Sequence, residues 1–232
     1  MVENRVSSAL ILEDDADWDI RIKSQLTDFA KLSRLFQGQD ESSTTHSPYG
    51  DSWDLLWLGT CMDEPGPKGE SNPELYPILN DMTVPSKRGL HMNREHDEQL
   101  LANFPEYTRL VHRPGSPICT YAYAVSYKGA QKLLYALSVK ELRGNFDNAL
   151  SWWCTDRQVV SPNCISVTPP YFYQHKSQTL VGGKNSDNGM WDPVEEKAST
   201  LSIRWSTRLN VERLLEGRTD FIDSYAEDAL KD

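Results

Sequence analysis

The chain has 232 residues, of which 38% are hydrophobic and 10% aromatic, which predicts one or two globular domains and excludes wholesale disorder. With 34 acidic residues against 24 basic ones, its net charge of −10 repels a phosphate backbone, so we expect no nucleic-acid partner. The longest aliphatic runs fall far short of the roughly 20 residues of a membrane helix, so we expect no membrane span.

We expect two buried strands and one helix in the first half of the chain. Residues 7–12 form a short continuous apolar run, which predicts a strand covered on both faces in a parallel sheet. Apolar residues recurring at helical spacing predict a helix from about 20 to 36, capped by Asp17 or Asp19. Residues 53–58 predict a second buried strand. Irregular loops are expected at 37–52 and 60–105.

In the second half of the chain we also expect strands that alternate with helices. Ser126 is expected to cap a helix over about 127–139. Further strands are predicted at 108–112, 118–125 and 165–168, and further helices at 146–154 and 203–215. This alternation predicts a single α/β domain over residues 1–232, with a mixed, mostly parallel sheet flanked by helices. We expect its binding site at the carboxyl ends of the strands.

Three consecutive carboxylates, Glu13, Asp14 and Asp15, directly follow the first predicted strand. These side chains repel one another and need a countercharge. A hard divalent cation such as Mn²⁺ or Mg²⁺ binds carboxylate oxygens, leaves room for substrate phosphates and stabilises a diphosphate leaving group. The alternative is an acidic helix N-terminus, because Asp and Glu also favour the first turn of a helix.

Further motifs follow the acidic triplet in a fixed order. They are Leu-Glu-Asp-Asp at 12–15, WDLLWLG at 53–59, TYAYAVSYKGAQKLL at 120–134, Phe-Asp at 146–147, and Pro-Pro at 169–170 followed by Gln174. Together they resemble glycosyltransferase family 25, which includes lipopolysaccharide and collagen galactosyltransferases, and most of all its fungal branch. The resemblance extends over nearly the whole chain.

The resemblance implies a GT-A-like fold without its first, nucleotide-binding strand, since family members begin with a strand and helix upstream of the acidic motif. It implies a UDP-sugar donor such as UDP-galactose and inverting transfer of the hexose to a hydroxyl of a glycan or glycoprotein acceptor. The implied compartment is the Golgi or endoplasmic reticulum lumen. Asp15, helped by Glu13 or Asp14, would hold the metal and the diphosphate.

Other side chains are candidates for the same site. An inverting transfer needs a carboxylate base for the incoming hydroxyl, and Asp147 matches the family's Asp, with Asp156 a second choice. His175 is a candidate further metal ligand, and Gln174 and Lys176 are candidates to contact the donor's sugar or phosphates. The alternatives are a helix N-terminal role for Asp147 and a structural role for His175.

Two functions of other classes compete with a transferase. One is a catalytically inactive carbohydrate-binding or scaffold protein of the same fold. The other is a glycoside hydrolase with two carboxylates about 5 to 9 Å apart, which needs neither metal nor nucleotide.

The cysteine spacing excludes two common sites. Cys61, Cys119, Cys154 and Cys164 fit neither a zinc site nor a C-x-x-C redox pair. They predict either buried thiols or one or two disulfides in a lumenal protein.

Overall fold

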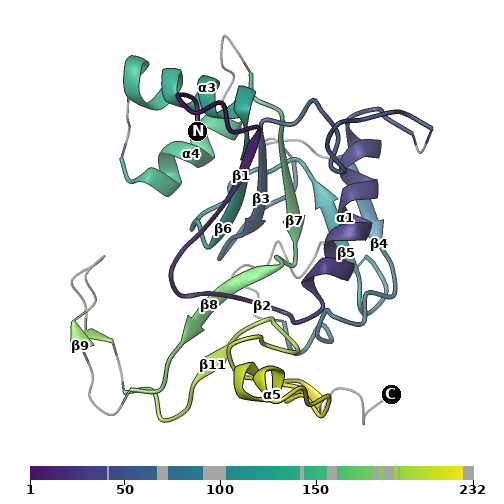
Figure 1. Cartoon of the computed structure of the whole chain (residues 1–232), viewed down its shortest axis with the longest axis vertical. Coiled ribbons are helices and arrows are strands. Elements are labelled where there is room, and N and C mark those ends of the chain that lie inside the picture. Colours follow the sequence, from purple (N-terminus) through teal and green to yellow (C-terminus); the bar gives the residue numbers. More distant parts are fainter. Residues whose placement is uncertain are drawn as a thin grey trace.

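A computed structural model describes residues 1–40, 42–66, 73–90, 103–141, 144–155, 161–179, 183–184, 191–192 and 194–226. In chain order the elements are β1 (Ser8–Leu12), β2 (Ala16–Trp18), α1 (Ile22–Phe36), β3 (Leu55–Gly59), β4 (Leu75–Ile78), β5 (Arg109–His112), β6 (Ala122–Ser126), α3 (Tyr127–Leu134), the π-helix η1 (Tyr135–Lys140), α4 (Phe146–Thr155), β7 (Cys164–Thr168), β8 (Phe172–Lys176), β9 (Gly183–Lys184), β10 (Trp191–Asp192), β11 (Ser199–Thr200) and α5 (Val211–Leu215). A central sheet lies between helices, and β8 leads from it toward a smaller sheet (Figure 1).

The central sheet is mostly antiparallel. Its six strands lie in the order β1-β6-β3-β7-β5-β4, and only β3 and β7 are parallel neighbours. The prediction of a mostly parallel, GT-A-like sheet is therefore wrong. Apolar runs indicate which segments are buried strands but not the direction of their neighbours, and here β6 runs back between β1 and β3.

The first strand is also less covered than predicted. β1 forms an edge of the sheet and pairs with β6 alone. Leu10 and Leu12 on this strand are 49% and 40% exposed. The prediction of a strand buried on both faces is wrong, because a continuous apolar run does not distinguish an edge strand from a central one.

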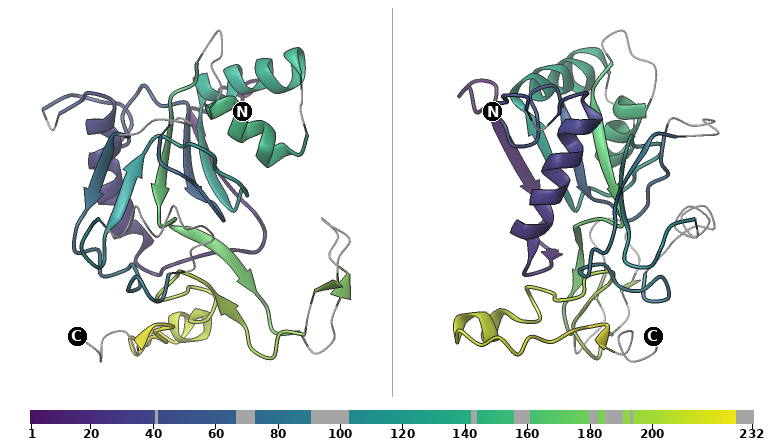
Figure 2. Two further views of the ribbon diagram at one scale, coloured as in Figure 1. Left: turned by 180° about the vertical axis from the view of Figure 1, so that it is seen from behind. Right: turned by 90° about the vertical axis from the view of Figure 1, so that its right-hand side faces the viewer.

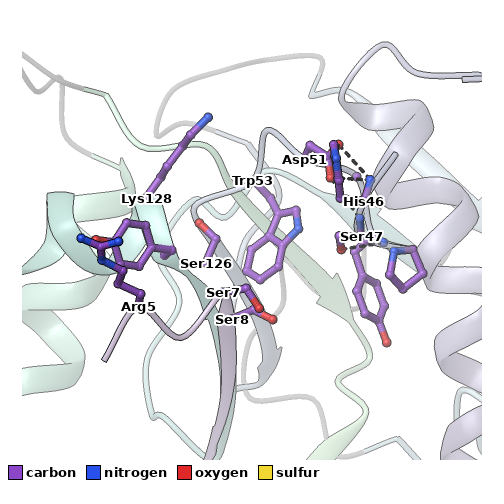
Figure 3. Close-up of a pocket in the computed structure, with 13 residues that line it drawn as sticks. Arg5, Ser7, Ser8, His46, Ser47, Asp51, Trp53, Ser126 and Lys128 are labelled. Carbon is purple, nitrogen blue, oxygen red and sulfur yellow. Dashed lines mark hydrogen bonds and ion pairs between the residues drawn. The ribbon is translucent and has the colours of Figure 1, made fainter. Parts of the chain in front are cut away.

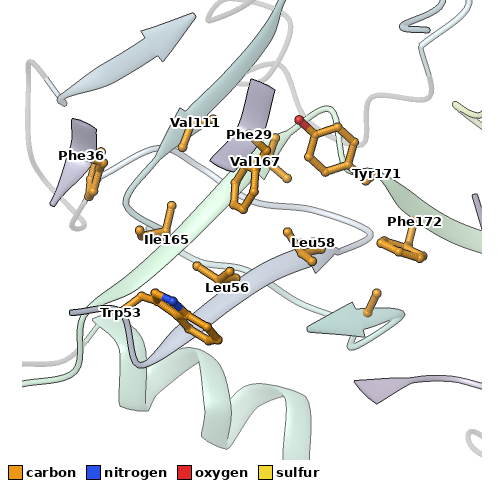
Figure 4. Packing of buried hydrophobic residues seen from close by; sticks show 11 residues of the cluster. Phe29, Phe36, Trp53, Leu56, Leu58, Val111, Ile165, Val167, Tyr171 and Phe172 are labelled. Carbon is orange, nitrogen blue, oxygen red and sulfur yellow. The ribbon is translucent and has the colours of Figure 1, made fainter. Parts of the chain in front are cut away.

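Helices cover the two faces of the central sheet. Along β3, Leu56 and Leu58 pack in the cluster that contains Phe29 of α1, whereas Leu55 and Trp57 pack in the cluster of α3 and α4. This alternation follows from the two-residue period of a strand. Figure 4 shows the first cluster, and Figure 2 shows α1 alongside the strands, well separated from α3 and α4.

Local sequence signals predicted several elements well. Helix α3 begins after Ser126, whose side chain accepts a hydrogen bond from Gly129 N, as expected of an N-cap. α1 and α4 lie close to their predicted ranges, but α1 begins at Ile22 without a side-chain cap. The caps predicted at Asp17 and Asp19 are wrong. The predicted C-terminal helix over 203–215 is reduced to α5.

A second, three-stranded antiparallel sheet has the order β11-β8-β2. The sequence predicted neither β2 nor β8 as a strand. β8 follows the corner at Pro169 and Pro170, and Tyr171 N at that corner donates a hydrogen bond to Leu58 O of β3. The corner therefore fixes where β8 leaves the central sheet.

All four cysteines form disulfides, Cys61–Cys119 and Cys154–Cys164. Of the two alternatives that the spacing left open, buried thiols are excluded. Two disulfides favour an oxidising compartment or an extracellular location. Among the residues that the structure describes, no helix has the length and apolarity to span a bilayer.

His112 gives the fold a pH-dependent stability. It is fully buried, with Nδ1 2.9 Å from Arg113 O and Nε2 2.9 Å from Thr168 Oγ1, and burial lowers its pKa to about 4. Between pH 6.5 and 4 the unfolded chain binds a proton there that the folded chain does not. We therefore expect His112 to cost about 3 kcal/mol of unfolding free energy on going from pH 7 to pH 4.

Urea unfolding of the wild type and His112→Gln at both pH values measures this cost. The difference in stability between the two proteins should shrink by about 3 kcal/mol at pH 4. A difference that is the same at both pH values would refute the assignment.

Candidate functional site

The acidic triplet forms the turn between β1 and β2. Ala16 N donates a hydrogen bond to Glu13 O in this turn, and helix α1 begins only at Ile22. The alternative of an acidic helix N-terminus is thereby excluded. Glu13 and Asp15 are half-buried, whereas Asp14 is exposed and accepts a hydrogen bond from Arg208 through its main-chain oxygen.

Pairing of β2 with β8 brings Asp15 beside Gln174 and His175. Gln174 Nε2 donates a hydrogen bond to Asp15 Oδ2 at 2.9 Å, and His175 N donates to Asp15 O at 2.8 Å. Three of the predicted site residues, far apart in sequence, therefore form one contiguous group. One carboxylate oxygen of Asp15 has no partner among the described residues.

A buried relay orients the imidazole of His175. Thr200 Oγ1 lies 2.6 Å from Asp17 Oδ2 and 2.8 Å from His175 Nδ1. Thr200 Oγ1 donates its single hydroxyl proton to Asp17 Oδ2, so His175 Nδ1–H donates to Thr200. Nε2 of His175 is then the unprotonated nitrogen, and it has no partner within the described part of the chain.

The electrostatic surroundings keep His175 neutral. Burial lowers its pKa, and the positive charge of Arg208 adds to this, while the charges of Asp17 and Asp15 oppose it. The net shift is downward. A neutral imidazole with a free Nε2 lone pair can accept a proton or ligate a metal ion.

A second group of predicted residues meets at the segment that leads into β6. Thr120 Oγ1 donates a hydrogen bond to Glu13 Oε1 at 2.7 Å, and Cys119 N donates to Asp147 Oδ2 at 3.3 Å. Glu13 and Asp147 are thus held by two consecutive residues. Asp147 also lies in the first turn of α4, where Asn148 N donates to its Oδ1, so its helix N-terminal role is present as well.

Two tyrosines lie between these groups. The rings of Tyr121 and Tyr173 are 5.3 Å apart between centroids. The pKa of Tyr121 is raised by burial first and then by Tyr173, Glu13 and Asp15, which places both carboxylates near its phenol. Burial, followed by the effect of Tyr225, raises the pKa of Tyr173 to about 12. The two phenols therefore stay protonated at neutral pH and can donate hydrogen bonds.

Two of the described predicted residues are not brought into this arrangement. The carboxylate of Asp14 is exposed, and Lys176 Nζ lies 3.6 Å from Glu195 Oε1 on the surface. Asp156 lies outside the described residues.

The site fits a metal ion only with a sparse ligand set. Nowhere in the described ranges do three or more His, Cys, Asp or Glu side chains converge as a metal centre. Asp15 and His175 offer one carboxylate oxygen and one imidazole nitrogen, which suits an ion whose remaining ligands are water and substrate phosphates. These two residues would hold the ion.

The sequence analysis missed Asp17, Thr200 and Tyr121. Asp17 and Thr200 are 183 positions apart and share no motif, so only the β2–β8–β11 pairing brings them together. Tyr121 stands within the quoted tyrosine-rich motif, directly after the Thr120 that holds Glu13. This position in the motif is the sequence feature that could have indicated Tyr121 as a site residue.

No protein-family model, curated protein or solved structure matches the chain in comparisons with known proteins. The function of this site is therefore inferred from its residues, their contacts and the sequence motifs.

Proposed function

We propose that the chain is a metal-assisted glycosyltransferase that moves a hexose, galactose in the first instance, from a UDP-sugar to an acceptor hydroxyl with inversion. The proposal rests on the motif resemblance to glycosyltransferase family 25 and on the group around Asp15. An oxidising compartment, which the disulfides favour, is compatible with the Golgi or endoplasmic reticulum lumen, and we propose that location.

The observation that carries the proposal is the oriented imidazole beside Asp15. A histidine whose Nδ1–H is held by a hydroxyl and a buried carboxylate presents Nε2 as a fixed lone pair, the usual arrangement of a metal-binding histidine. A divalent cation bound by Asp15 and His175 would supply the positive charge that stabilises a departing diphosphate.

The remaining roles follow from contacts of the chain itself. Asp147 is half-buried and has its carboxylate fixed by Cys119 N, so it can take the proton of an incoming hydroxyl. Glu13 is fixed by Thr120, and the phenol of Tyr121 lies near Glu13 and Asp15. They can orient sugar hydroxyls by accepting and donating hydrogen bonds.

Release of UDP from UDP-galactose in the presence of Mn²⁺ tests these roles. Asp15→Asn should lower the rate about a hundredfold, and Thr200→Val, which frees the imidazole of His175, about tenfold. Asp14→Asn removes the same charge one residue away on an exposed side chain and should leave the rate within about twofold. Equal rates for the wild type and Asp15→Asn would remove the assigned role.

A catalytically inactive carbohydrate-binding or scaffold protein is the second candidate, and one observation favours it. One cavity of the described residues that borders this region, at Cys61 and Tyr173, encloses about 30 Å³. Small-molecule sites enclose roughly 300–1,000 Å³. UDP binding in the presence of Mn²⁺ separates the two candidates, because the enzyme requires it and the scaffold does not.

A further inference from the structure

A cavity of the described residues lies away from the acidic turn. It encloses about 870 Å³ and lies around Trp53, where β1 begins, β6 ends and α3 starts. The acidic turn follows the opposite end of β1, and a five-residue strand separates the two ends by roughly 16 Å. The cavity is therefore separate from the proposed transferase site.

One side of the cavity carries positive charge that nothing in the described chain neutralises. Arg5 and Lys128 line it, and neither side chain has an ion-pair or hydrogen-bond partner among the described residues. The N–H of Lys128, in the first turn of α3, also has no acceptor there, whereas that of Tyr127 donates to Ser7 O and that of Gly129 to Ser126 Oγ. Two unpaired cations beside a helix N-terminus favour an anionic ligand.

A buried polar group faces the same cavity. Trp53 is only 5% exposed, and no described residue accepts a hydrogen bond from its indole N–H. Figure 3 shows Trp53 between the two sides of the cavity, with its nitrogen turned toward His46, Ser47 and Asp51. This N–H has no acceptor in the described chain and faces the cavity, so an oxygen atom of a ligand there can accept its hydrogen bond.

The side opposite the cations offers an acceptor. Asp51 accepts hydrogen bonds from the main-chain nitrogens of His46 and Ser47, and its side chain is still 36% exposed. These hydrogen bonds lower its pKa, so it is a carboxylate at neutral pH. A ligand hydroxyl placed there can donate to Asp51 and accept from Trp53.

We propose that this cavity is a binding site for a sugar phosphate, with its phosphate at Arg5 and Lys128 and its hydroxyls between Trp53 and Asp51. The volume is sufficient, since it lies within the roughly 300–1,000 Å³ of small-molecule sites. Both halves of the ligand are required, because the cations select the anion and the Trp53–Asp51 pair selects the polyol.

Isothermal titration calorimetry with glucose 6-phosphate tests the proposal. The wild type should bind with a Kd of about 1 mM or tighter, and glucose or inorganic phosphate alone should each bind at least about tenfold more weakly. Failure of glucose 6-phosphate to saturate the wild type at about 20 mM would overturn the site. Equal binding of inorganic phosphate would overturn its polyol half.

Three variants locate the binding. Arg5→Ala/Lys128→Ala should weaken glucose 6-phosphate binding about tenfold or more, because it removes both charge-assisted contacts. Lys23→Ala, which removes one positive charge from the exposed face of α1, should leave the Kd unchanged. Trp53→Phe keeps the packing but removes the N–H and should weaken binding severalfold. If Trp53→Phe fails to fold, the surface variants still decide, since equal affinity in Arg5→Ala/Lys128→Ala and the wild type refutes the site.

Discussion

Replacing Arg109 with methionine is expected to lower the free energy of unfolding by about 4 kcal/mol. The Arg109 side chain is 3% exposed and donates from Nε to Asp81 Oδ2 at 2.8 Å and from Nη1 to the carbonyl oxygens of Pro169 and Pro170. Its guanidinium also stacks on Tyr171, 4.2 Å from the ring centroid. Removing it leaves Asp81 and two carbonyl oxygens buried without their donor.

The Arg109–Asp81 pair also bears on function, because the corner it holds leads into β8, which carries Gln174 and His175. Burial alone would raise the pKa of Asp81, but the charge of Arg109 and hydrogen bonds from Thr83 and Arg109 outweigh it. We therefore expect the losses in Arg109→Met and Asp81→Asn to be strongly non-additive. Urea unfolding of both single variants and the double variant measures this. A loss below about 1 kcal/mol in Arg109→Met, or additive losses, would contradict the account.

Removing the Cys61–Cys119 disulfide is the second large effect that we expect. The two cysteines are 58 positions apart, so Cys61→Ser/Cys119→Ser should lower the unfolding free energy by about 4 kcal/mol. Cys119 N also holds Asp147, and the next residue, Thr120, holds Glu13. We therefore expect a loss of UDP release beyond what unfolding explains.

The second disulfide gives a matched control. Cys154 and Cys164 are 10 positions apart, so Cys154→Ser/Cys164→Ser should cost about 3 kcal/mol. Cys154 lies near the end of α4, opposite the first turn that holds Asp147, and the hydrogen bonds of Asp147 and Glu13 described above involve neither Cys154 nor Cys164. If the two double variants, compared at a temperature where both are folded, lose UDP release equally, the link between Cys119 and the site is refuted.

The sequence predicted local elements better than their arrangement. The apolar run at 53–58 predicted β3, and the hydroxyl of Ser126 predicted the start of α3, because both signals act within a few residues. The direction of β6 depends on contacts across the sheet, which no local pattern encodes. β2 and β8 carried no distinct strand signal, because each mixes polar and apolar residues and neither contains a continuous apolar run.

In the candidate site, too, local motifs singled out residues but did not indicate how these residues are arranged. Glu13, Asp15, Gln174, His175 and Asp147, which the sequence motifs singled out, lie in the two groups described above. The outward direction of Asp14 and the relay through Thr200 follow from the β2–β8–β11 pairing. They could not be derived from spacing along the chain.

Calorimetric titration of UDP into the protein with Mn²⁺ present tests the central claim, that Asp15 and His175 bind a cation and through it a diphosphate. The wild type and Asp14→Asn should bind UDP with micromolar affinity, whereas Asp15→Asn, or the wild type with Mn²⁺ removed by a chelator, should bind at least about tenfold more weakly. Absence of UDP binding to the wild type, or equal affinity in Asp15→Asn, would contradict it.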